Sequence, residues 1–325
     1  MDFYPPSNPN PLPPRSTEIA TFMGTPFAQS LEDAGINMFG VPYDGASTIR
    51  TGTHHCTHGL HNQSSLMRAI NHATRINPFE WAKIGDMGNA PFPHKFAVET
   101  THDEIEAFAE KLPGSDILAI AIVGDHSVSL PLLSAIAKDV PVALICVDAH
   151  ADTADSFQVS IFDHGAPFRR AVDEGLIDPT KTIQIGIRGT QNTAEGRSIS
   201  ESRGVRDKLR EEFHERGPAA FAARVCALVG DMPVCLIYDI DSLDPVNAPV
   251  TGTPETGAIT TDHALVLLRS LRDLNDVSAD LVEAPPDFDA GDVTSLTGAA
   301  LAYEILCLLA EARGKKGIMM TFETA

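Results

Sequence analysis

The sequence predicts an α/β fold in which helices cover both faces of a mainly parallel sheet. Short apolar or β-rich runs alternate along the chain with amphipathic stretches, which is typical of β-α-β crossover units. The 325 residues are 43% hydrophobic and 21% charged, as is ordinary for a globular protein. Because no repeat or shift of composition marks a boundary after residue 30, we expect a Pro-rich, extended arm over residues 1–30 and a single domain over residues 31–325.

The expected strands are short runs rich in Ile, Val and other apolar residues. In chain order they span residues 36–42, 81–86, 117–124, 142–148, 182–188, 234–241, 277–284 and 317–324. Amphipathic stretches that predict helices lie at residues 100–112, 128–138, 205–230, 261–274 and 293–313. In an open sheet built this way, ligands bind beyond the carboxyl ends of the strands.

Composition narrows the functional classes. The net charge of −20 argues against a nucleic-acid partner and weakly favours a cationic substrate. No window approaches eighteen consecutive apolar residues, and the N-terminus lacks the pattern of a signal peptide, so no membrane association is expected. The five cysteines form no CxxC pair, and several lie inside apolar runs. This usage predicts a reduced, cytoplasmic location.

Carboxylates and imidazoles lie at the ends of three of the expected strands. The set is His126 at the end of the third strand, Asp148, His150 and Asp152 at the end of the fourth, and Asp239 and Asp241 at the end of the sixth. A spacing of two in an extended chain points side chains the same way, so these groups converge. Ionised carboxylates gathered at one edge require cations. Oxygen ligands with some imidazole suit Mn²⁺, Fe²⁺, Ni²⁺, Co²⁺ or Zn²⁺, and a set of this size suits two ions about 3.5–4 Å apart.

The motifs around these residues resemble those of the ureohydrolases, the arginase and agmatinase superfamily, and above all its agmatinase-like branch. They are GVPYDGASTIRTGT (40–53), GDHS (124–127), DAHAD (148–152), DHGAPFRR (163–170), DIDSLDPVNAP (239–249), TGTPE (251–255) and VEAPPDFD (282–289). The resemblance implies a three-layer α/β/α sandwich of the arginase type, forming a single ureohydrolase domain. It also implies a dinuclear metal centre that hydrolyses a guanidinium group to urea and an amine.

The resemblance also assigns roles to individual residues. It implies that His126, Asp148, Asp152 and Asp239 bind one ion and that Asp148, His150, Asp239 and Asp241 bind the other, so that Asp148 and Asp239 bridge. Two such cations lower the pKa of a water molecule to about neutrality. Asp152 is also expected to accept a hydrogen bond from the hydroxide, His164 to protonate the leaving amine, and Glu283 to bind the guanidinium.

The expected cofactors are two divalent ions per chain, Mn²⁺ or Ni²⁺. The expected partner is a small cationic guanidino compound, with agmatine and 4-guanidinobutyrate as the default substrates. The enzyme is expected to form a homo-oligomer, a trimer or hexamer, and a hetero-oligomer stays open. Two other classes also stay open: a deacetylase that uses a single zinc in a similar fold, and a non-catalytic partner subunit.

One segment departs from the agmatinase-like pattern. The loop at residues 52–64 carries His54, His55, His58 and His61. These histidines form either a third metal site or, as we favour, an altered pocket mouth or subunit contact. An altered mouth leaves room for a divergent substrate such as guanidine, an alkylguanidine or a biguanide like metformin, for which nickel is the expected metal.

Overall fold

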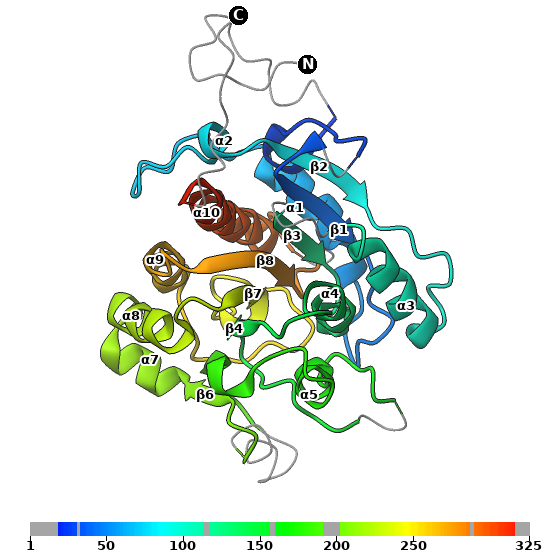
Figure 1. Cartoon of the computed structure of the whole chain (residues 1–325), viewed down its shortest axis with the longest axis vertical. Coiled ribbons are helices and arrows are strands. Elements are labelled where there is room, and N and C mark those ends of the chain that lie inside the picture. Colours follow the sequence, from blue (N-terminus) through cyan, green and yellow to red (C-terminus); the bar gives the residue numbers. More distant parts are fainter. Residues whose placement is uncertain are drawn as a thin grey trace, which may run out of the picture.

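An eight-stranded sheet, in the order β2-β1-β3-β8-β7-β4-β5-β6, forms the centre of the molecule (Figure 1). All paired strands are parallel. The strands are β1 (Ile36–Val41), β2 (Ile84–Asn89), β3 (Leu118–Val123), β4 (Ala143–Val147), β5 (Ile183–Ile187), β6 (Arg206–Leu209), β7 (Pro233–Asp239) and β8 (Asn275–Val282). This computed structural model describes residues 19–30, 33–112, 118–156, 160–190, 202–286 and 289–315.

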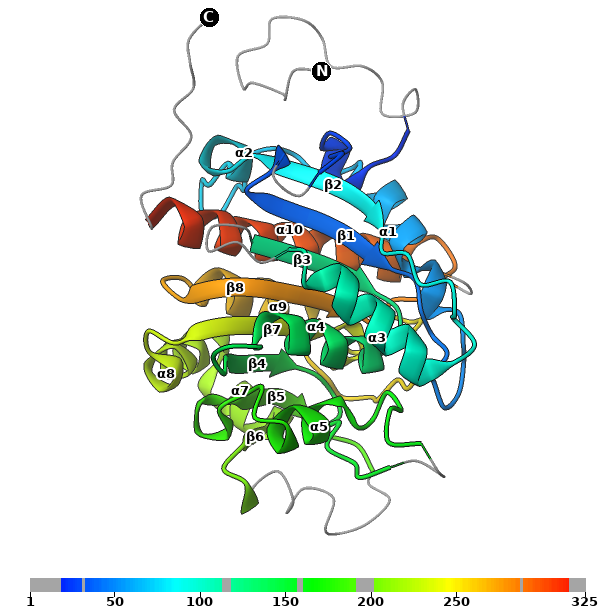
Figure 2. The same ribbon diagram turned by 45° about the vertical axis from the view of Figure 1, so that its right-hand side comes forward.

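Helices cover both faces of the sheet and make the predicted three-layer sandwich (Figure 2). One face carries α3 (Val98–Ala109), α4 (Ser129–Ile136) and α5 (Pro167–Asp173). The other carries α1 (Cys56–Ser64), α7 (Arg210–Arg216), α8 (Pro218–Val229), α9 (Thr261–Ser270) and α10 (Val293–Lys315), with the short α2 (Pro78–Trp81) beside α10. The two large buried apolar clusters lie on opposite sides of the sheet, because strands buried on both faces need a core on each side.

The prediction of one amphipathic helix over residues 205–230 is wrong. This stretch begins with the edge strand β6 and continues as two helices, α7 and α8. Gly217 separates the helices with a φ of 78°, and Pro218 then starts α8 at a position where no backbone N–H is needed. The sequence of β6, RDKL, has no apolar run, and among the described strands it pairs only with β5, so hydrophobic periodicity missed it.

The helix α10 is long and apolar enough to cross a membrane by length and composition, yet 78% of its apolar window is buried inside the fold. It is the central helix of its layer and packs on α1, α9 and β8. The predicted strand at 317–324 lies outside the described residues, as do residues 1–18 of the predicted arm. Of the rest of that arm, Phe22 is buried in the core and its backbone N–H donates to Asp86 Oδ2 at 2.9 Å.

The order of strands decides where the functional residues meet. The strands β3, β8, β7 and β4 are consecutive neighbours in the middle of the sheet. Since all run parallel, their carboxyl ends lie along one edge, and the residues that follow them face a common space. That edge carries all the residues predicted from the strand ends.

Candidate metal centre

Short turns directly after the central strands hold the predicted ligands. His126 opens the 3₁₀ helix η4 (His126–Val128) after β3, and Asp148 follows β4 directly. Asp239 is the last residue of β7, and its carboxylate accepts the backbone N–H of Asp241 at 2.8 Å, which starts η6 (Ile240–Ser242). Each turn ends its strand with a polar side chain at the edge of the sheet.

The first cluster surrounds Nδ1 of His126. This atom lies 2.8 Å from Asp152 Oδ2, 3.2 Å from Asp148 Oδ2 and 3.3 Å from Asp239 Oδ2. The His126 side chain is 1% exposed. Within the described part of the chain, neither of its ring nitrogens has a hydrogen-bond partner. A buried imidazole nitrogen that faces three carboxylates without a hydrogen bond fits a divalent cation.

The second cluster surrounds Nδ1 of His150, which lies 3.0 Å from Asp241 Oδ2 and 3.6 Å from Asp148 Oδ1. Asp148 therefore turns Oδ2 toward His126 and Oδ1 toward His150, which is the arrangement expected of a bridging carboxylate. Asp239 turns Oδ2 toward His126, while its Oδ1 accepts the N–H of Asp241. Bridging by Asp239 stays a prediction.

The charges of this cluster do not balance without added cations. Burial, together with the neighbouring carboxylates, raises the pKa of Asp152, Asp239 and Asp241. Burial has the same tendency at Asp148, but the adjacent imidazoles of His126 and His150 outweigh it and hold its pKa well below the usual range. Burial opposes protonation of His150, yet Asp241 and Asp148 raise its pKa to about 12. Four carboxylates facing two imidazoles leave a net negative charge that divalent ions neutralise.

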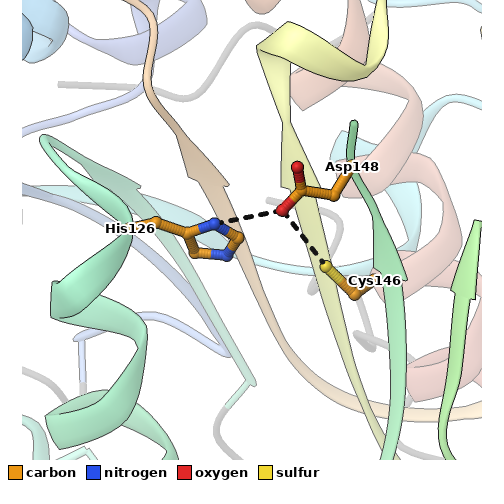
Figure 3. A group of neighbouring side chains, drawn as sticks. All are labelled: His126, Cys146 and Asp148. Carbon is orange, nitrogen blue, oxygen red and sulfur yellow. Dashed lines mark hydrogen bonds and ion pairs between the residues drawn. The ribbon is translucent and has the colours of Figure 1, made fainter. Parts of the chain in front are cut away.

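Cys146 is a neighbour that the sequence interpretation missed. Its Sγ lies 3.9 Å from Asp148 Oδ2, and it stands with Asp148 and His126 in one group (Figure 3). Burial raises the pKa of the Cys146 thiol well above its usual range, so it stays a neutral thiol beneath the carboxylates. The spacing of two from Asp148 along the strand was the available signal, but an apolar run concealed it.

His164 and Glu283 form a pair beside the first cluster. Glu283 Oε1 lies 3.2 Å from His164 Nδ1 and accepts the backbone N–H of His126 at 3.1 Å. Its Oε2 is buried and has no hydrogen-bond partner among the described residues. Burial opposes protonation of His164, but the hydrogen bond and charge of Glu283 prevail and raise its pKa to about 9. The pair therefore offers a proton donor beside a free carboxylate oxygen.

The backbone is strained at two of these residues. Asp152 has a φ of 46° and Glu283 a φ of 59°, both in the left-handed region that favours glycine. A side chain in this region costs on the order of 1–3 kcal/mol, and such residues cluster at functional sites. The surrounding fold thus holds both carboxylates in place at the expense of stability.

The histidines of the segment at 52–64 do not gather around one point, although the rings of His54 and His55 lie side by side with centroids 3.9 Å apart. His54 Nδ1 lies 2.6 Å from Asp44 Oδ2, whereas His61 Nε2 lies 3.0 Å from Asp86 Oδ2. Within the described ranges, the groups able to hold a metal ion are His126 with Cys146 and Asp148, and Asp148 with His150 and Asp241. The third metal site considered from the sequence is therefore not formed there. The segment instead folds as η3 (Thr53–His55) followed by α1.

Comparisons with known proteins agree with this geometry. The model of the arginase family matches residues 34–308. A guanidinopropionase from Pseudomonas aeruginosa is 40% identical over 316 residues, which cover 95% of this chain and 99% of the relative. An agmatinase from Proteus mirabilis is 40% identical over 281 residues, covering 86% and 88%. The solved proclavaminate amidino hydrolase from Streptomyces clavuligerus has a TM-score of 0.88 at 32% identity, covering 92% of this chain and all of that one.

Proposed function

The chain belongs to the arginase family, and from this premise we propose a dinuclear-metal hydrolase that cleaves a guanidino C–N bond to give urea and an amine. The observation that carries the proposal is the buried Oε2 of Glu283, which lies beside the two ligand clusters and has no hydrogen-bond partner among the described residues. A buried carboxylate oxygen without a donor is costly unless a ligand supplies one. A guanidinium supplies parallel N–H donors in a plane.

The chain would hold two divalent ions with the ligands already described. His126, Asp148, Asp152 and Asp239 would hold one, and Asp148, His150 and Asp241, with Asp239 as the second bridge, would hold the other. When bound, such a pair supplies Lewis acidity and lowers the pKa of water toward neutrality. The donor set of carboxylates and imidazoles suits both Mn²⁺ and Ni²⁺. We favour Mn²⁺ for a guanidino acid or agmatine and Ni²⁺ for guanidine, an alkylguanidine or a biguanide.

The protein side chains then divide the work on the substrate. Glu283 binds the guanidinium and fixes its plane, because two N–H groups meet one carboxylate. Asp152 accepts a proton from the attacking water. His164, whose pKa lies near 9, carries the proton that the departing amine requires. Its burial keeps bulk water from competing for that proton.

For the substrate we propose a guanidino acid, with agmatine as the second choice. The guanidinopropionase resemblance covers nearly all of both chains. In this structure Arg50 is exposed, and it lies two residues after Thr48, which contacts His164. A cation in the loop beside the site favours a carboxylate at the far end of the substrate and disfavours the ammonium of agmatine. The proposed homo-trimer or hexamer and the cytoplasmic location stay predictions.

A panel assay tests the proposal. Metal-free protein would be reconstituted in parallel with Mn²⁺ and Ni²⁺ and assayed for urea from 3-guanidinopropionate, 4-guanidinobutyrate, agmatine and guanidine, with metformin alongside. We expect the guanidino acids to have the highest kcat/KM. His164→Ala should lower kcat by roughly 10²–10⁴ with unchanged metal content. The matched control is His94→Ala, since His94 is 65% exposed on the surface. Absence of urea with every substrate and metal would refute the function.

A further inference from the structure

The hydroxyl of Thr48 contacts the ring nitrogen of His164 that Glu283 leaves free. Thr48 Oγ1 lies 2.8 Å from His164 Nε2, and the backbone N–H of Thr48 points at the same atom from 3.3 Å. His164 is 9% exposed, whereas Thr48 is exposed. Thr48 therefore stands between the buried imidazole and solvent.

Asp125 holds the loop that carries Thr48. Its Oδ2 accepts the backbone N–H of Ala46 at 2.9 Å, and its own N–H donates to the carbonyl of Tyr43 at 2.8 Å. The carbonyl of Ala46 in turn accepts the N–H of His164 at 3.3 Å. Asp125 is fully buried. These bonds fix the distance between Thr48 and His164 from both sides, so the contact does not depend on a free loop.

A hydroxyl is the group that suits both protonation states of the ring. It donates to Nε2 when that nitrogen is bare and accepts from Nε2 when it carries a proton. The backbone N–H of Thr48 can only donate. Since Nδ1 faces Glu283, a proton that enters or leaves the ring on the solvent side passes through Nε2 and its neighbour Thr48.

We propose that Thr48 is a positioning residue that relays protons between solvent and His164. The inference rests on the proposed function, in which His164 protonates the amine. As the guanidino C–N bond breaks, its electron pair goes to the amine nitrogen, which takes a proton from the protonated ring of His164. The neutral ring keeps its Nδ1 proton toward Glu283 and is left with Nε2 bare. His164 Nε2 then takes the hydroxyl proton of Thr48, and Thr48 Oγ1 takes a proton from solvent. One proton crosses from solvent to product, and the ring is protonated again.

Thr48→Val and Thr48→Ser test this relay in the metal-loaded enzyme. Valine keeps the shape and the backbone N–H but removes the hydroxyl, whereas serine keeps the hydroxyl. We expect Thr48→Val to lower kcat about tenfold, since water replaces a relay only in part, with KM within about twofold. Imidazole added to the buffer should raise the kcat of Thr48→Val in proportion to its concentration. Thr48→Ser should stay within about twofold of wild type. Thr51→Val, at an exposed position of the same loop, is the matched control.

The outcomes separate this inference from the proposed function. A wild-type enzyme that releases no urea refutes the function itself. If the wild type is active and Thr48→Val keeps its kcat, Thr48 does not relay protons and the proposal is refuted. Equal loss in Thr48→Ser and Thr48→Val, no response to imidazole, or loss of metal in Thr48→Val would each show a purely structural role and overturn the proposal.

Discussion

Glu283 joins three parts of the site through a single side chain. One oxygen meets both the ring of His164 and the backbone of His126, and the other is buried without a partner in the described part of the chain. Its left-handed backbone, with a φ of 59°, aims the side chain away from the direction that an extended strand would give it. Orientation of this carboxylate is therefore built into the turn after β8.

Glu283→Gln should weaken catalysis without removing metal. Glutamine keeps an oxygen for the N–H of His126 but turns one acceptor into a donor that faces the guanidinium. Loss of a charged partner in a desolvated pocket costs about 2–5 kcal/mol, which should appear in kcat/KM. Steady-state kinetics with the best substrate and elemental analysis measure the two quantities. Wild-type efficiency would remove Glu283 from substrate binding, and loss of metal would make it a ligand.

The pair of His164 and Glu283 should also make stability depend on pH in metal-free protein. The pKa of His164 is raised from 6.5 to about 9. A raised histidine pKa stabilises the fold fully below the unfolded pKa, and this contribution disappears as the pH rises through the folded pKa. The free energy of unfolding of wild type minus that of His164→Asn should thus shrink by about 2–3 kcal/mol between pH 6 and pH 10. Urea unfolding in the presence of a chelator measures this difference in free energy. A difference that does not change with pH would contradict the pairing of His164 with Glu283.

At the scale of elements, α9 and α10 are joined by two arginine–carboxylate pairs. Glu304 is buried and accepts from Arg269 Nε at 2.8 Å and from Asn71 Nδ2 at 2.8 Å. Glu311 accepts from Arg272 Nε at 2.8 Å. Arg269 is 22% exposed, whereas Arg272 is 43% exposed. The first pair is therefore the more strongly desolvated.

Arg269→Ala should destabilise the protein more than Arg272→Ala. Removal of Arg269 leaves the Glu304 carboxylate buried without its cation, which we expect to lower the free energy of unfolding by about 2 kcal/mol. Arg272→Ala serves as the matched control and should cost less, about 1 kcal/mol, because Arg272 is the more exposed arginine and water can take its place beside the buried Glu311. Replacing Glu304 by Leu as well should recover part of the loss. Urea denaturation measures the free energy of unfolding of each variant. Equal losses in Arg269→Ala and Arg272→Ala would contradict the prediction.

At the scale of the whole molecule, the metal centre concentrates the charge imbalance of the chain. The sequence has 44 acidic against 24 basic residues, and four of the carboxylates converge at the ends of the central strands. Because the predicted ligands follow β3, β4 and β7, a bound ion would join β3 to the paired strands β7 and β4, from which β8 separates it in the sheet. Metal binding should therefore stabilise the whole fold.

Mn²⁺ or Ni²⁺ at about 100 times its dissociation constant should raise the free energy of unfolding by about 3 kcal/mol. For a chain of this length that corresponds to an increase in Tm of about 5 °C. Asp148→Ala should abolish the increase and reduce the metal content from two ions toward none, because Asp148 faces both clusters. Glu99→Gln, at an exposed position of α3, should keep the stabilisation by metal. If metal still raises the Tm of Asp148→Ala, the ions bind elsewhere.

The sequence by itself determined the fold class and the identity of the residues at the strand ends. Apolar runs and the two-residue spacing of Asp148 and His150 are local signals, readable without the fold. The family, predicted from its motifs, is confirmed, and so is the hydrolysis of a guanidino bond. The pairing of Asp148 with both histidines could be anticipated only in outline, since it depends on the order of the strands.

Only the tertiary structure decided the contacts between distant segments. Thr48 and His164 are 116 positions apart, and nothing in either segment indicates the other. Cys146 was concealed because its strand is apolar along its whole length, and β6 was missed because an edge strand can fold without an apolar run. Periodicity records which side of an element is buried. It does not record which neighbour buries it, because that is set by the packing of the whole chain.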